Sequence, residues 1–413
     1  LLKTTDFKAD EVRFTAVSPG GMNHIADEDF ATGAMAANIV DLGGVGEFDA
    51  VQLKKLLAGK VVNVSPSISP EYEGISGSAS PRDLETAMQL IYLYFHNPRK
   101  DTTAFESFRT RMTAMLENFG NMPERVFSDT LQVTMANYHP RARPMNKEWL
   151  ESVDLEKAFD FYLDRFADAS DFTFIFVGNI TAEELRPLAE QYLGALPTTG
   201  RKETWKDNGV RPPKGIVKKE VYKGIDEKSM VAVVFTGPFD WSYENRHRLS
   251  SLRELLNIRL REAIREDAGG SYGVGVNANP DRYPEEDYML LVNFGTDPER
   301  MDEMIGTLFT TLQDVRDELT TEENLVKIKE IQRREREKSI KENSFWIGHL
   351  QSALSNNDPL NYFLALDELI ESLTLEDLRD AARKYIDMDN YIQVSLYPEA
   401  KPETDKAVGE VTE

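Results

Sequence analysis

The second half of this chain repeats the first, and this repetition constrains the fold more than any single motif. The strand-like run Val231–Phe239 repeats the alternation of Glu11–Val17, and a turn follows both runs. Later, the segment 374–396 repeats the segment 154–176. The pairs keep one order and an offset of about 217 to 220 residues, which chance rarely preserves. We therefore predict two copies of one unit of roughly 200 residues.

Within each copy, short strand-like runs alternate with longer helical stretches. In the first copy the expected strands include Val61–Ser67, Tyr72–Ser78 and Phe172–Val177. This pattern predicts an α+β fold of two tandem homologous α/β units, each a mostly antiparallel sheet covered by helices. Between the copies the composition shifts to Gly, Pro, Lys, Thr and Asp without an apolar period, which is typical of a linker. We place the first unit at residues 1–197, the linker at 198–215 and the second unit at 216–413.

Composition and charge exclude two classes of partner. With 413 residues, 41% of them hydrophobic, the chain is long enough for two globular cores. Its formal net charge of −23 argues against nucleic acid, which is bound by clustered Lys and Arg. No apolar run approaches the roughly 20 residues of a membrane-spanning helix. The charged tract Lys327–Lys341 alternates basic residues with Glu at helical spacing, so we predict a solvated helix face.

One corner of the second copy combines two polar side chains. A charged helical stretch ends at Gly269-Gly270 and continues as an alternating strand, so Arg265 falls near the last helical turn and Tyr272 near the first strand residue. These side chains could converge on one point. The strand face of Gly273, Gly275 and Asn277 would admit another backbone, which indicates a peptide-like partner. A purely structural role remains an alternative, because both residue types are ordinary at these positions.

The residue types give little support for a metal site or for a catalytic nucleophile in this chain. The chain has no cysteine, so thiolate catalysis and cysteine metal sites are excluded. His24 lies close to Asp27, Glu28 and Asp29, but no second histidine follows at ligand spacing, and an acidic helix N-terminus explains the cluster better. The remaining histidines are isolated in sequence, and we expect each to be a surface or packing residue: His96, His139, His247 and His349.

The tandem units and the corner together resemble the non-catalytic half of the insulinase/pitrilysin family of zinc metallopeptidases. The spacing of Arg265 and Tyr272 fits this family, as do Gly43-Gly-Val-Gly46 and Ser80–Glu85 of the first copy. In such peptidases two halves close around a peptide, and His-x-x-Glu-His binds zinc in the other half. The matching helix here, Asp29–Asn38, has neither histidine nor glutamate. The resemblance therefore implies a chain that holds no zinc and is inactive alone.

The resemblance also implies roles for the two corner residues. Arg265 and Tyr272 would reach a substrate bound at the zinc of the missing half. A neutral phenol can donate a hydrogen bond to a developing oxyanion, and a guanidinium can hold a carbonyl or carboxylate. The expected partners are the N-terminal catalytic half of the same protein, or a separate catalytic subunit, and a peptide. The alternative is a peptidase-derived pseudoenzyme that serves as a peptide-binding or assembly scaffold.

The compartment stays open at the level of sequence. The chain begins with Leu1 and shows no signal peptide, so we expect a fragment or a processed product. The habits of the family favour the bacterial periplasm or cell envelope, with the cytoplasm as the alternative.

Overall fold

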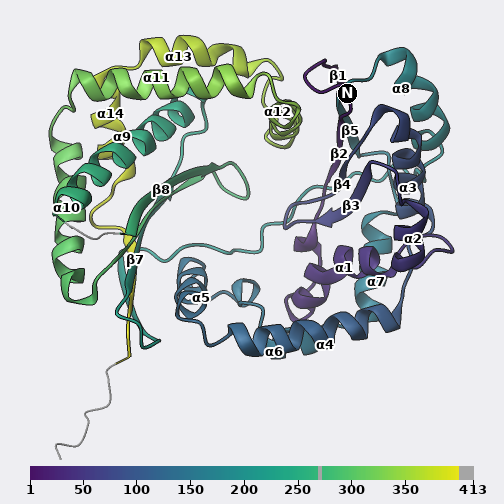
Figure 1. Ribbon diagram of the computed structural model, residues 1–413, viewed down its shortest axis with the longest axis horizontal. Helices are drawn as coiled ribbons and strands as arrows, with labels where there is room; N and C mark the ends of the chain where they lie inside the picture. Colours follow the sequence, from purple (N-terminus) through teal and green to yellow (C-terminus); the bar gives the residue numbers. More distant parts are fainter. Residues whose placement is uncertain (268–271, 400–413) are drawn as a thin grey trace, which may run out of the picture.

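The computed structural model describes residues 1–267 and 272–399, except for the side chains of residues 265–267 and 272. It confirms the predicted fold class, because two tandem units each contain a five-stranded, mostly antiparallel sheet covered by helices. Figure 1 shows the first unit on the right and the second on the left.

The first sheet has the strand order β1-β5-β2-β4-β3. Its neighbours are antiparallel except β1, which runs parallel to β5 at the edge. Along β2 the alternating residues Val12, Phe14 and Ala16 are buried against the helices. The strands are β1 (Leu2–Thr4), β2 (Val12–Pro19), β3 (Val62–Ile68), β4 (Tyr72–Ala79) and β5 (Thr173–Gly178).

The second sheet has the equivalent order β6-β10-β7-β9-β8, again with one parallel pair, β6 with β10. Each strand takes the place of its counterpart in the first sheet, which is the topology expected of a duplicated unit. The strands are β6 (Ile216–Tyr222), β7 (Ser229–Pro238), β8 (Tyr272–Asp281), β9 (Asp287–Thr296) and β10 (Tyr391–Tyr397).

Helices cover one face of each sheet and build its core. In the first unit α1, α3 and α7 bury this face, and α1 lies close because its buried residues are mostly small. In the second unit α9, α10 and α14 do the same. The helices of the first unit are α1 (Phe30–Gly43), α2 (Ala50–Leu56), α3 (Leu84–His96), α4 (Thr102–Phe119), α5 (Pro123–Met135), α6 (Lys147–Glu151), α7 (Leu155–Arg165) and α8 (Ala182–Leu188). Those of the second are α9 (Tyr243–Asp267), α10 (Met301–Asp317), α11 (Glu322–Ser339), α12 (Asn343–Ser355), α13 (Leu366–Ser372) and α14 (Leu375–Tyr385).

One helix from each unit crosses to the sheet of the other. Helix α5 packs on β6 and β10 of the second sheet, and α12 packs on β2 and β5 of the first (Figure 1). The α5 contact is apolar and buries Phe127. The α12 contact includes polar bonds, such as Asn343 Nδ2 to Glu11 Oε2 at 2.9 Å and the Tyr72 hydroxyl to the Ser355 carbonyl at 2.9 Å. Both units therefore contribute to each other's stability.

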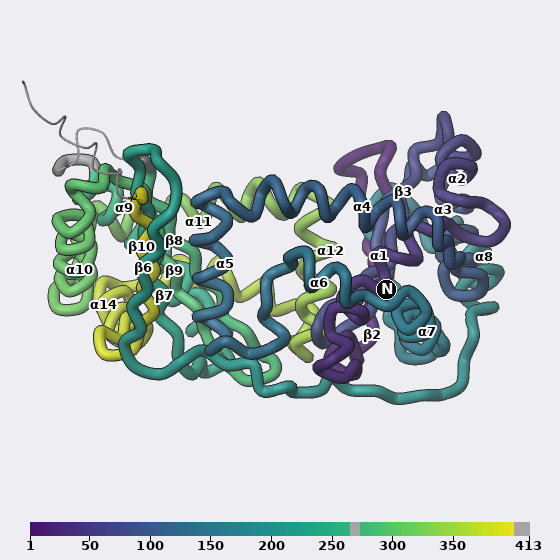
Figure 2. Tube along the Cα trace, turned by 90° about the horizontal axis from the view of Figure 1, so that it is seen from below, coloured from purple at the N-terminus to yellow at the C-terminus, as the bar shows by residue number. Residues whose placement is uncertain are grey.

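The predicted linker carries no helix or strand between residues 197 and 213 and runs from one unit to the other (Figure 2). It is nevertheless held in place. Asn208 Nδ2 donates to the Asn23 carbonyl at 3.1 Å, the Trp205 ring lies 5.1 Å from that of Tyr283, and Arg211 pairs with Glu285 at 2.9 Å.

The charged tract of the second unit is helix α11, and its ion pairs have the predicted spacing. They are Glu323–Lys327 at 2.7 Å, Glu330–Arg334 at 2.5 Å and Glu337–Lys341 at 3.2 Å. In the part of the chain that the structure describes, no helix has the length and apolarity needed to cross a bilayer.

A buried carboxyl group in the first unit makes stability depend on pH. Glu73 of β4 is 1% exposed, and burial raises its pKa from 4.5 to about 7, although the Gly21 N–H donates to Oε2 at 2.6 Å. The folded chain therefore binds this proton more tightly than the unfolded chain. Its contribution is complete below pH 4.5 and is lost as the pH rises through about 7.

We expect Glu73→Gln to remove this loss. Between pH 5 and pH 8 the free energy of unfolding of the wild type should fall by up to roughly 3 kcal/mol more than that of the variant. Urea unfolding at both pH values measures the difference. Glu190→Gln, at an exposed carboxylate, is the matched control. Equal pH dependence in the Glu73 variant and the wild type would contradict the prediction.

Candidate functional site

The predicted corner is a helix followed by an edge strand. Helix α9 contains the backbone of Arg265 and ends at Asp267, and β8 begins at Tyr272. Tyr272 stands opposite Gly295 of β9 in the antiparallel ladder. The side chains of Arg265 and Tyr272 lie outside the described part of the chain, so their convergence stays a prediction.

A cleft of about 700 Å³ opens beside the start of β8. On one side are Gly273 and the β9 segment 293–295, and on the other are the start of α5 and the loop before β7. The cleft therefore lies where the second sheet meets the helix contributed by the first unit. Sequence reasoning missed this loop, because the order of the strands in the second sheet, which places the β6–β7 connection at the same end as the start of β8, could not be read from the sequence.

The predicted glycine-lined face is open at one position and closed at the next. A Cβ atom added at Gly273 would meet none of the described residues within 4 Å, whereas one at Gly275 would lie 3.0 Å from Asn293 Oδ1. Among the described strands β8 pairs only with β9, so its other edge presents free backbone groups. An extended peptide can add to such an edge as a further strand.

The cleft suits binding better than bond breaking. Its lining includes Ser229, whose hydroxyl is buried and has no hydrogen-bond partner in the described structure, but no histidine that could act as its base. Of the lining charges, Lys223 is paired with Glu399 at 3.6 Å. Among its described lining residues the cleft therefore offers polar and apolar groups for binding, without a nucleophile and a base in contact.

The carboxylates near His24 are used in structural ion pairs. Asp27 accepts from Arg141 Nε at 2.6 Å, and Asp29 accepts from Lys157 Nζ at 2.7 Å, while His24 Nε2 lies 2.8 Å from the Thr204 carbonyl. The remaining histidines have separate neighbours in the structure: His96 stacks on Tyr92, His139 accepts from the Arg141 N–H, His247 bonds Gln332, and His349 bonds the Leu360 carbonyl.

Helix α1 does not provide ligands for zinc. Its residues are Phe-Ala-Thr-Gly-Ala-Met-Ala-Ala-Asn-Ile-Val-Asp-Leu-Gly, and its single carboxylate, Asp41, accepts from the Tyr94 hydroxyl at 2.7 Å. Among the described residues no group of three His, Asp or Glu side chains is placed to hold a metal ion. The residues that the structure describes therefore do not fit a zinc site.

We expect this chain, prepared without chelator, to carry far less than one zinc ion per molecule. The physical reason is the missing donor set, since a protein zinc site needs three or four converging His, Cys or carboxylate ligands. Elemental analysis of the purified chain measures the content. About one tightly held zinc per chain would contradict the expectation and would direct attention first to His24.

Comparison with known proteins supports one family. The family description "Peptidase M16 inactive domain" matches residues 152–332. "Probable zinc protease PqqL" from Haemophilus influenzae is 23% identical over 391 residues, which cover 92% of this chain and 41% of that protein. The structure of the periplasmic protease PqqL from Escherichia coli superposes with a TM-score of 0.82 at 20% identity, covering 95% of this chain and 43% of that one. A peptidase M16 inactive domain from Pseudomonas fluorescens superposes with a TM-score of 0.81 at 16% identity, covering 98% and 96%.

The family match includes the second sheet's first helix and the corner, which carried the resemblance in the sequence. The chain spans less than half the length of the curated relatives that it matches. The resemblance stated from the sequence is thereby confirmed: residues 152–332 match the inactive domain of the M16 peptidases, the insulinase/pitrilysin family, and the chain is similar over most of its length to PqqL zinc proteases.

Proposed function

We propose that this chain is the non-catalytic half of a zinc-dependent peptidase and closes over a peptide substrate held by a catalytic half. Arg265 would hold a substrate carbonyl or carboxylate, and the Tyr272 hydroxyl would donate to the oxyanion of the transition state. The zinc would be bound entirely by the catalytic half.

The observation that carries this proposal is the cleft at the start of β8. It reaches Gly273, the residue after Tyr272, where a side chain would meet no described residue, and its described lining has no histidine that could serve as a base. The free edge of β8 begins at the same residue pair, on the side of the strand away from β9. Such a surface can bind an extended peptide but cannot cleave it. The catalytic groups would then have to come from another chain or another half.

The partner is either an N-terminal catalytic half of the same protein or a separate catalytic subunit. We also propose that residues 1–197 and 216–413 are the two domains, joined by residues 198–215, and that the protein works in the bacterial periplasm or cell envelope. The solved PqqL of Escherichia coli is described as periplasmic, which favours that location over the cytoplasm.

The alternative is a peptidase-derived scaffold that binds peptide or partner without any part in cleavage. One experiment separates the two. The chain is mixed with a catalytic half that carries His-x-x-Glu-His, and hydrolysis of a quenched-fluorescence peptide library is measured with each component alone and with both. We expect activity only in the mixture, and complex formation without any hydrolysis would favour the scaffold.

A further inference from the structure

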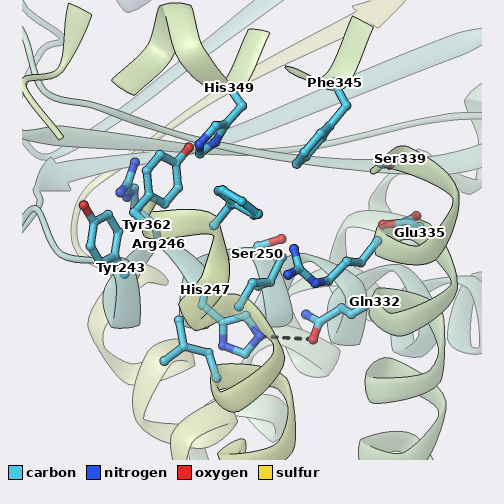
Figure 3. A pocket seen from close by; sticks show the side chains of 14 residues that line it. Tyr243, Arg246, His247, Ser250, Gln332, Glu335, Ser339, Phe345, His349 and Tyr362 are labelled. Carbon is cyan, nitrogen blue, oxygen red and sulfur yellow. Dashed lines mark hydrogen bonds between the residues drawn. The ribbon is translucent and has the colours of Figure 1, made fainter. Parts of the chain in front are cut away.

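A second cavity lies among the helices of the second unit, away from the cleft at β8. It has a volume of about 370 Å³ and is lined by α9, α11, α12, α13 and the short helix Tyr362–Ala365. In Figure 3, Tyr243, Arg246 and Tyr362 stand on one side and Glu335 and Ser339 on the other. This volume lies at the lower end of the range for small-molecule sites.

Arg336 brings a buried guanidinium to this cavity. Its side chain is 10% exposed, and Nε and Nη2 donate to the two carboxylate oxygens of the exposed Asp367. Its Nη1 is buried and has no hydrogen-bond partner among the described residues. A buried N–H of a charged group without an acceptor is costly, so an acceptor bound in the cavity would stabilise it.

Arg246 brings a second guanidinium to the opposite side. Its Nη2 lies 3.0 Å from Asp358 Oδ2, but the orientation is not that of a hydrogen bond, and both atoms lack hydrogen-bond partners. The Nη1 atom of Arg282 lies 3.6 Å from Oδ1 of the same carboxylate. Arg282 also pairs with the exposed Glu286, whose Oε1 lies 3.9 Å from its Nε. Arg246 and Arg282 thus share the buried carboxylate of Asp358, and Arg246 has no second acid within ion-pair distance among the described residues.

The cavity walls between Arg246 and Arg336 are aromatic. The His349 ring lies 4.5 Å from that of Tyr362 and 5.0 Å from that of Phe363, and Phe345 stacks on His349 at 5.9 Å. Leu366 and Leu369 extend the apolar lining. A ligand here must bury an apolar body and present one acceptor group to a guanidinium.

We propose that this cavity binds a small carboxylate with an aromatic or branched aliphatic body, of the size of an N-capped hydrophobic amino acid. A planar carboxylate matches the geometry of guanidinium N–H groups and carries a single charge. A dianion such as a phosphate ester would be repelled more strongly than a monoanion by the carboxylate of Glu335, which also lines the cavity. The proposal does not depend on the proposed peptidase role.

The test uses N-acetyl-L-phenylalanine as the probe and N-acetyl-L-phenylalaninamide as its uncharged match. Binding to the full chain is followed by titration calorimetry and by tryptophan fluorescence, because the Trp241 ring lies 4.5 Å from Arg246 Cζ. We expect saturable binding of the acid at least tenfold tighter than that of the amide, the ratio that loss of one charge-assisted hydrogen bond produces.

Two variants and one control assign the binding to this cavity. Arg336→Gln should weaken the acid at least tenfold and leave the amide unchanged. Ser250→Leu, which places a larger apolar side chain in the cavity and keeps both guanidiniums, should weaken both ligands. Arg333→Gln is the matched control, because Arg333 lies on the same helix, is paired with Glu371 and does not line the cavity.

Three outcomes would overturn the proposal: no saturable binding of the acid, equal affinities for acid and amide, or equal effects of the Arg336 and Arg333 variants. Melting temperatures of all variants are recorded in parallel. If Arg336→Gln unfolds the chain, the Ser250 variant and the comparison of acid with amide still decide the question.

Discussion

Tyr272→Phe is expected to lower kcat and kcat/KM together by roughly ten- to thousandfold in a peptidase reconstituted from this chain and its catalytic half. The substitution removes only a hydroxyl and keeps the aromatic ring. A donor that acts on the oxyanion contributes in the transition state and little in the ground state. Both kinetic constants should therefore fall while KM changes little. Initial-rate kinetics with a single fluorogenic peptide measure the effect.

The matched control is Tyr391→Phe, at the start of β10 in the same sheet. It also removes one phenol hydroxyl, and we expect turnover to stay unchanged.

Arg265→Ala should act more on KM, because a guanidinium that holds the peptide contributes to the ground state and the transition state alike. If Tyr272→Phe left turnover intact and lowered the melting temperature, Tyr272 would be a packing residue and the proposed role would be wrong.

The fold class could be predicted because the same order of strand-like and helical segments occurs in both copies. Runs such as 12–17 and 231–238 are rich in β-branched and aromatic residues and end in turn residues, so they were recognised as strands although residues on both faces of β7 are buried. The capping boxes at Thr181 and Thr374 begin α8 and α14. These signals are local, and the same physics acts at equivalent positions in both copies.

Three strands could not be predicted from their residues. Strand β1 has only three residues, and β6 is rich in Lys and Glu because it lies at an edge. Strand β9 is apolar on both faces: Leu290 and Val292 pack under the helices, while Met289 and Leu291 join the cluster beneath α5. A strand buried on two sides loses the alternation by which strands are recognised.

The candidate sites depend on contacts that sequence reading could not supply. The corner was predictable, because Gly269-Gly270 separates a helical period from a strand period in one short stretch. The cleft beside it was not, since α5 comes from the other unit. The cavity lined by Arg246 and Arg336 could not be predicted either. These residues are 90 positions apart in the chain, and only the packing of α9 against α11 brings them to one cavity.

Phe127→Ala is expected to lower the free energy of unfolding by roughly 3 to 5 kcal/mol. Phe127 is 5% exposed on α5 and packs into a cluster formed by strands of the second unit, including Val234, Ile392 and Val394. Truncation leaves a cavity between two rigid surfaces, a helix of one unit and a sheet of the other. Because α5 also borders the cleft, peptide binding should weaken as well.

Urea unfolding of the 413-residue chain measures the loss, with Phe119→Ala on α4 as the matched control. Phe119 is 48% exposed, so its removal should cost no more than about 0.5 kcal/mol.

If the exchange of α5 and α12 couples the units, Phe127→Ala should shift the unfolding of both, as followed by Trp149 in the first unit and Trp241 in the second. A shift confined to Trp241 would mean that the units unfold independently, and equal costs at the two phenylalanines would show that α5 does not stabilise the second sheet.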